Sequence, residues 1–246
     1  MTNEEYLELL LRRDNLRREA HEYQIRYLQK FGELILKNHE MRIEIIKYKK
    51  MIAYCQKKVN HGQTINGNEL DQYIDMVMTG YNNQLSQLAD DVAWANSSST
   101  ISEYDASKVR KLYYKLARKL HPDMNPALTD DYAFQDLWMQ VRMAYEANDL
   151  DGLEEMEELL ELLMKEKGLS EHSPVIEDLE EKAEKVRSEI EFIMSTDPYT
   201  YRFLLMDEEA VEQKMDELTE QLENSLEYLD KLKETFAQFN VERLVS

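Results

Sequence analysis

The sequence VRKLYYKLARKLHPD occupies residues 109–123 and predicts one amphipathic helix with a sharp end. Its apolar side chains recur every three or four residues and so share one helix face: Val109, Leu112, Tyr113, Leu116, Ala117 and Leu120. Basic side chains lie off that face: Lys111, Lys115, Arg118 and Lys119. Pro122 lacks an amide hydrogen and disfavours helical backbone at His121, so the helix should end at the His-Pro-Asp tripeptide.

A second amphipathic run follows after a short connection. It places six residues on one helix face: Phe134, Leu137, Trp138, Val141, Ala144 and Tyr145. Two amphipathic helices joined by a short loop pack antiparallel. We therefore expect a core in which Val109, Leu112, Tyr113 and Leu116 meet Trp138, Val141 and Tyr145.

Together these features resemble the J-domain of DnaJ-like co-chaperones over about residues 101–150. The resemblance rests on the apolar and basic faces of the first helix, the His-Pro-Asp tripeptide, and the aromatic, aliphatic and Ala-Tyr positions of the second helix. In J-domains this tripeptide is needed to stimulate ATP hydrolysis by a DnaK-class chaperone. The resemblance implies that His121, Pro122 and Asp123 contact such a chaperone. It further implies that the basic residues meet an acidic partner surface, namely Lys111, Lys115, Arg118 and Lys119.

The chain also departs from that family. The usual first helix, with its Tyr-Tyr and Leu-x-Val signature, is missing before Asp105, and the helix ending near Trp94 could pack in its place. There is no Gly/Phe-rich region, CxxC zinc module or β-rich client-binding region. A second interpretation therefore stays open, a structural or adaptor coiled-coil protein with a degenerate J-like fold and no chaperone stimulation.

The composition predicts an all-α protein. Only 6 glycines and 4 prolines occur among 246 residues, too few for a chain rich in β-turns. Acidic residues outnumber basic ones by 50 to 30, so the chain as a whole should be repelled by nucleic acid and by anionic membranes. The exception is the stretch from Lys108 to Lys119, which holds basic residues and no acidic one.

Enzymatic chemistry is not indicated. His121 and Asp123 would need a third group and a pocket for acid–base catalysis, and more ligands to hold a metal. No Gly-rich phosphate loop is present, so any ATP hydrolysis would belong to the partner. We expect no cofactor and no metal. Cys55 is the only cysteine, the N-terminus is acidic, and no apolar run approaches membrane-spanning length, which together favour the cytoplasm.

The pattern divides the chain into three parts within an elongated helical protein. Residues 1–95 predict a helical hairpin, with a heptad seam interrupted by Asn38. Residues 101–150 form the J-like segment, after a polar boundary at 96–100. Residues 151–246 predict acidic helices and a coiled-coil hairpin. The flanking helices would bind a client, a complex or another copy.

The C-terminal part contains a linker at 171–174 and two heptad runs. The first run passes through Ile176, Leu179, Ala183, Val186, Ile190 and Ile193, and the second extends from Val211 to Phe239. Pro198 lies between the runs and should break the helix. Heptad spacing leaves open whether these helices pair within one chain or join two chains as a homodimer.

Overall fold

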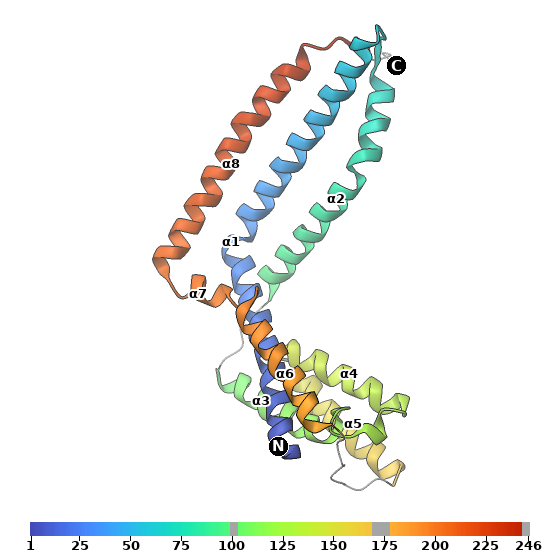
Figure 1. The fold of residues 1–246 in the computed structure, drawn as a ribbon, viewed down its shortest axis with the longest axis vertical. Coiled ribbons are helices and arrows are strands. Elements are labelled where there is room, and N and C mark those ends of the chain that lie inside the picture. The colour runs from blue at the N-terminus through green and yellow to red at the C-terminus, as the bar shows by residue number, and fades with distance from the viewer. Residues whose placement is uncertain (99–102, 169–177, 243–246) are drawn as a thin grey trace. The chain divides into compact units, whose positions relative to one another are not determined.

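The computed structural model describes residues 1–98, 103–168 and 178–242, and the predicted all-α fold class is confirmed (Figure 1). The helices are α1 (Asn3–Asn60), α2 (Gly67–Ser97), α3 (Glu103–Leu120), the short 3-10 helix η1 (Pro126–Leu128), α4 (Tyr132–Glu146), α5 (Leu150–Glu166), α6 (Leu179–Ser195), α7 (Tyr201–Leu205) and α8 (Glu208–Ala237). Two-residue strands, β1 (Ile65–Asn66) and β2 (Val241–Glu242), pair in parallel. Among the described residues, every helix is too short or too polar to cross a bilayer.

The chain forms two compact units. Unit 1 consists of Met1–Gln24 and Ser99–Arg202, and unit 2 consists of Ile25–Ser98 and Phe203–Ser246. Helix α1 contributes residues to both units. Four predicted features lie outside the described ranges: the boundary residues 99–100, the start of the J-like segment at 101, the linker at 171–174, and Ile176 at the start of the first C-terminal heptad run.

This division departs from the predicted one in two places. Residues 1–24 belong with the J-like segment in unit 1 and not with the rest of the predicted hairpin of 1–95. The predicted C-terminal part, 151–246, is divided, because α5 and α6 belong to unit 1 and α8 belongs to unit 2. Heptad spacing specifies which face of a helix is buried but not which helix covers it, so it did not indicate that the two C-terminal runs belong to different units.

Unit 1 is built around the helices α3, α4 and α5, which pack on one another. Helix α6 and the first residues of α1 add to the same core. Every one of these segments contributes buried apolar side chains, among them Leu10, Val109, Val141, Leu153 and Ile190. The helix break predicted at Pro198 is present, since α6 ends at Ser195.

Unit 2 consists of three long helices that lie side by side, with α1 between α2 and α8 (Figure 1). Gly32 permits a close approach of α1 and α2, because a Cβ atom there would lie 3.0 Å from a methyl group of Val92. On the other side of α1, Asn38 donates a hydrogen bond from Nδ2 to the carbonyl oxygen of Leu218 on α8, at 2.8 Å. The predicted polar interruption of the seam thus makes a defined contact between two helices.

Candidate functional site

The predicted core between α3 and α4 is present in unit 1. Val109, Tyr113, Leu116, Val141 and Tyr145 are buried, while Leu112 and Trp138 are half-buried at the edge of the same cluster. The rings of Tyr113 and Tyr145 stack with centroids 3.8 Å apart and planes 7° from parallel. Trp138 stacks on the ring of Tyr113 at a centroid distance of 6.0 Å. All seven predicted core residues are therefore brought together.

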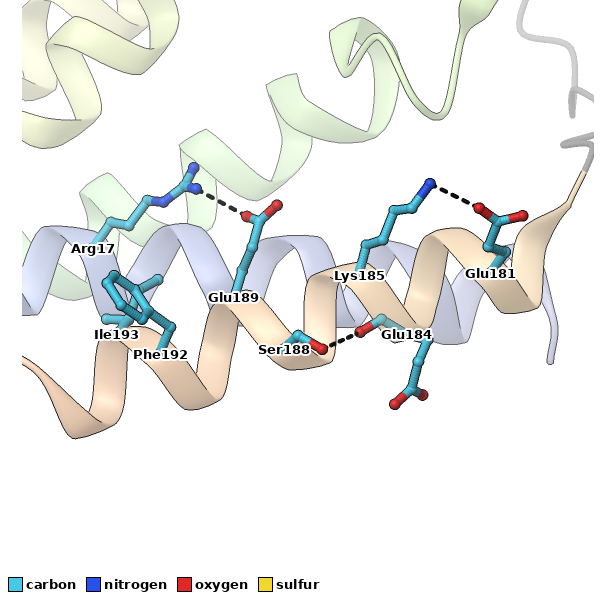
Figure 2. A pocket seen from close by; sticks show the side chains of 8 residues that line it. All are labelled: Arg17, Glu181, Glu184, Lys185, Ser188, Glu189, Phe192 and Ile193. Carbon is cyan, nitrogen blue, oxygen red and sulfur yellow. Dashed lines mark hydrogen bonds and ion pairs between the residues drawn. The ribbon is translucent and has the colours of Figure 1, made fainter.

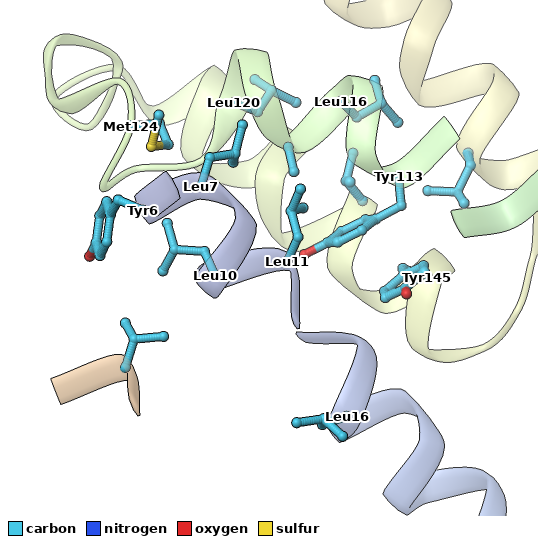
Figure 3. Packing of buried hydrophobic residues seen from close by; sticks show 14 of the residues in the cluster. Tyr6, Leu7, Leu10, Leu11, Leu16, Tyr113, Leu116, Leu120, Met124 and Tyr145 are labelled. Carbon is cyan, nitrogen blue, oxygen red and sulfur yellow. The ribbon is translucent and has the colours of Figure 1, made fainter. Parts of the chain in front are cut away.

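The first turns of α1 complete this core, which the sequence did not predict. Tyr6, Leu7, Leu10 and Leu11 are buried against residues of α3 (Figure 3). The expectation that the helix ending near Trp94 would fill this position is wrong, because Trp94 belongs to unit 2 and is 49% exposed. The apolar residues at positions 6, 7, 10 and 11 were a usable signal, since they form a helix stripe separate from the heptad seam.

A buried carboxylate also ties α1 to α3. Asp14 accepts a hydrogen bond from the Tyr113 hydroxyl at 2.7 Å, and its other oxygen pairs with the Arg13 guanidinium at 2.8 Å. Both Asp14 and Tyr113 are buried. Burial, together with the charge of Asp14, raises the pKa of Tyr113 well above its ordinary value, so the phenol remains a donor. Through the contact with Tyr113, Asp14 joins α1 to α3 within unit 1.

The His121-Pro122-Asp123 tripeptide forms the turn that ends α3. His121 is only 3% exposed, and its ring lies edge-on to Trp138 at a centroid distance of 5.0 Å. Its Nδ1 atom accepts a hydrogen bond from the backbone N–H of Asp123 at 3.1 Å. The His121 carbonyl oxygen accepts from the backbone N–H groups of Met124 and Asn125, each at 2.9 Å. Hydrogen bonds to the side chain and to the carbonyl oxygen of His121 therefore stabilise this turn.

Burial sets the charge of this histidine. It lowers the pKa of His121 to about 4, although Asp123 and Asp14 act in the opposite direction. Near neutral pH the ring is therefore uncharged. Because Nδ1 is the acceptor, the ring proton resides on Nε2. A protonated ring would lose the hydrogen bond from Asp123, so the neutral form supports this turn.

Asp123 has a different environment from His121. Its side chain is half-buried, and its Oδ2 atom accepts a hydrogen bond from the Tyr6 hydroxyl at 3.0 Å. Pro122 is also half-buried. The tripeptide thus combines a histidine fixed in the core with a carboxylate at the surface, and a residue of α1 contacts that carboxylate.

The predicted basic residues lie on α3, the helix that ends at the tripeptide. Lys111, Lys115 and Arg118 are exposed and Lys119 is half-buried. Lys115 pairs with Glu157 of α5, and Arg118 pairs with Glu4 of α1. The basic side chains of these pairs are 57% and 63% exposed, so solvent screens the pairs, and they hold the basic groups only weakly.

A groove lies elsewhere on unit 1, along α6 and beside Arg17 (Figure 2). Its volume is about 740 Å³, and it is lined by charged side chains together with Phe192 and Ile193. Charged side chains at the groove are paired, as shown by Arg17 with Glu189 at 2.9 Å and Lys185 with Glu181 at 2.8 Å. Exposed ion pairs of this kind are ordinary on a helix surface in contact with water.

Comparisons with known proteins give no relative. No family model, no curated protein and no solved structure matches the chain. In the three described ranges, no group of three or more His, Cys, Asp or Glu side chains is arranged to hold a metal ion. The features that bear on function are therefore the geometry of α3, the tripeptide and the first turns of α1.

Proposed function

We propose that this protein is a J-domain-type co-chaperone. It recruits a DnaK-class chaperone and stimulates ATP hydrolysis by that partner through His121, Pro122 and Asp123. The observation that carries the proposal is the tripeptide at the end of α3, with an uncharged, buried His121 and a surface carboxylate on Asp123. This is an arrangement in which one side chain fixes the turn and the other meets a partner.

The packing of the first turns of α1 supports the same proposal. The family resemblance implies a first helix packed on the α3–α4 pair, and a tyrosine followed by leucines fills this position from the start of the chain. The adaptor alternative was based on the absence of a first helix next to α3. Because the first turns of α1 pack in this position, that reason for the alternative carries less weight. The helical hairpin of residues 25–98 is then an insertion between the first and second helices of the module.

The mechanism would be allosteric. Asp123 would engage a basic group of the chaperone, and contacts that are stronger in one chaperone conformation than in another would shift its equilibrium toward hydrolysis. The basic residues of α3 would accelerate encounter with an acidic surface and orient the complex. This attraction should weaken as salt is added. The ATP site would belong to the chaperone, and this chain would supply no cofactor.

Single-turnover ATP hydrolysis by a DnaK-class chaperone tests the proposal. Asp123→Asn and His121→Gln should each abolish the stimulation given by the wild-type protein, with unchanged circular dichroism. Asp130→Asn is the matched control, because Asp130 is an exposed carboxylate in the same connection between α3 and α4. Its stimulation should equal that of the wild type. Absence of stimulation by the wild type with several chaperones at low salt would favour the adaptor interpretation.

A further inference from the structure

The hydroxyl of Tyr6 reaches the tripeptide across a long stretch of sequence. Tyr6 and Asp123 are separated by 117 positions, yet the hydroxyl donates to Oδ2 of the carboxylate at 3.0 Å. The Tyr6 side chain belongs to the core of unit 1 together with Leu7 and Met124 and is only 1% exposed (Figure 3). A ring packed in this way cannot easily move its hydroxyl, so the position of the donor is fixed by the fold.

We propose that Tyr6 is a positioning residue that holds the Asp123 carboxylate in one orientation for the chaperone's basic group. This inference rests on the proposed function and deepens it, because it places the first turns of α1 in the stimulating site. Tyr6 need not touch the chaperone. It acts through Asp123, whose side chain would otherwise rotate at the end of a surface turn.

Asp123 is held at two points. Its backbone N–H donates to Nδ1 of His121, which fixes the main chain, and its Oδ2 atom accepts from Tyr6, which fixes the side chain. Within the described part of the chain, the Oδ1 atom accepts no hydrogen bond and is left for a partner. A carboxylate arranged in advance loses less conformational freedom when it pairs with a cation.

The chemistry of the donor matters as much as its position. A tyrosine hydroxyl is neutral, so it orients the carboxylate without cancelling its negative charge, as a lysine or arginine would. Burial, followed by the charge of Asp123, raises the pKa of Tyr6 above its ordinary value, so the hydroxyl keeps its proton beside the carboxylate. The Tyr6 hydroxyl therefore orients Asp123 as a neutral donor.

Tyr6→Phe removes only the hydroxyl and leaves the ring in the core. The assay is single-turnover ATP hydrolysis by a DnaK-class chaperone over a range of concentrations of this protein. The maximal stimulation should fall by about fivefold or more, since a hydrogen bond to a charged group is worth at least that factor. The concentration giving half-maximal stimulation should change by less than about twofold, because the basic residues of α3 remain to guide encounter.

Tyr145→Phe is the matched control. Tyr145 is buried in the same core, and its hydroxyl donates to Oδ1 of Asn15 at 3.2 Å instead of to the tripeptide. This variant also loses the hydrogen bond of a buried tyrosine hydroxyl, here to a neutral amide, but should stimulate as the wild type does. A second measurement needs no chaperone. NMR couplings about the Cα–Cβ bond of Asp123 should indicate one rotamer in the wild type and in Tyr145→Phe, and averaged rotamers in Tyr6→Phe.

The outcomes separate this inference from the proposed function. Wild-type stimulation that Tyr6→Phe leaves unchanged, with an unchanged Asp123 rotamer, would overturn the role of Tyr6 and leave the co-chaperone proposal standing. Increased stimulation by Tyr6→Phe would also overturn it, because Tyr6 would then withhold Asp123 from the partner. Equal losses in the Tyr6 and Tyr145 variants would reduce Tyr6 to a core residue. Absence of wild-type stimulation would overturn both proposals.

Discussion

Lowering the pH from 8 to 5 should destabilise unit 1 through His121. In the unfolded chain this imidazole takes up a proton near its ordinary pKa of about 6.5. In the folded protein, burial lowers the pKa of His121 to about 4. Between these values the unfolded state binds more protons than the folded state, so the free energy of unfolding falls as the pH falls. The contribution of His121 is fully present above pH 6.5 and is lost on approach to pH 4.

The magnitude follows from the difference between the two pKa values. At pH 5 the ring is almost wholly protonated in the unfolded chain but only about one-tenth protonated in the folded protein. Linkage then gives a loss of about 2 kcal/mol relative to pH 8, and about 3 kcal/mol below pH 4. Solvent screening reduces this little, since the His121 side chain is buried against Trp138.

The assay is urea unfolding of Trp94→Phe protein, followed by the fluorescence of Trp138. Removing the tryptophan of unit 2 leaves the one beside His121 as the reporter for unit 1. Other groups also titrate in this range, so the measured quantity is the difference in unfolding free energy between this protein and its His121→Gln variant at each pH. That difference should shrink by about 2 kcal/mol from pH 8 to pH 5.

Two results would refute the reasoning. One is a free-energy difference between the two proteins that stays constant from pH 8 to pH 5. The other is an NMR titration in which the His121 ring protonates near pH 6.5 in the folded protein, because that would place the ring in water instead of in the core.

Three further predictions concern stability and use urea unfolding as the measurement. Tyr113→Phe should lower the free energy of unfolding by about 1.5–3 kcal/mol, because it removes a buried hydrogen bond to the charged Asp14; a loss below the error of the method would contradict this. Gly32→Leu should cost about 1–3 kcal/mol by overpacking the contact of α1 with α2. Gly80→Ala is its control, since a Cβ there meets nothing within 4 Å, and it should stabilise α2 by about 0.5–1 kcal/mol. Lys115→Gln should leave the urea midpoint unchanged within the error of the method, as expected of an exposed ion pair, and a clear fall in the midpoint would show that the pair is structural.

Local patterns were sufficient to predict α3, α4 and their shared core. The three-to-four spacing of apolar residues specifies a buried face, and Pro122 specifies where α3 ends. Both were correct because each depends on residues close together in the sequence. The basic residues were placed on α3, and the tripeptide at the end of α3, for the same reason.

Local patterns did not indicate which helix packs against which. The heptad run in α8 and the seam of α1 carry the same spacing as other helices of the chain, so their pairing depends on three-dimensional fit and not on pattern. The contact of Tyr6 with Asp123 and that of Asp14 with Tyr113 join residues about one hundred positions apart. No local signal identifies such pairs, although the apolar stripe at positions 6, 7, 10 and 11 indicated a buried face.

The discontinuity of unit 1 has a consequence for synthesis of the chain. The ribosome makes residues 1–24 before their partners in α3, which follow only after residues 25–98. About 100 residues separate the apolar stripe of Tyr6 and Leu10 from α3. At about 5–20 residues per second, the stripe spends roughly 5–20 s without the surface that buries it. During translation the early helix is thus itself an exposed hydrophobic segment, of the kind that chaperones protect.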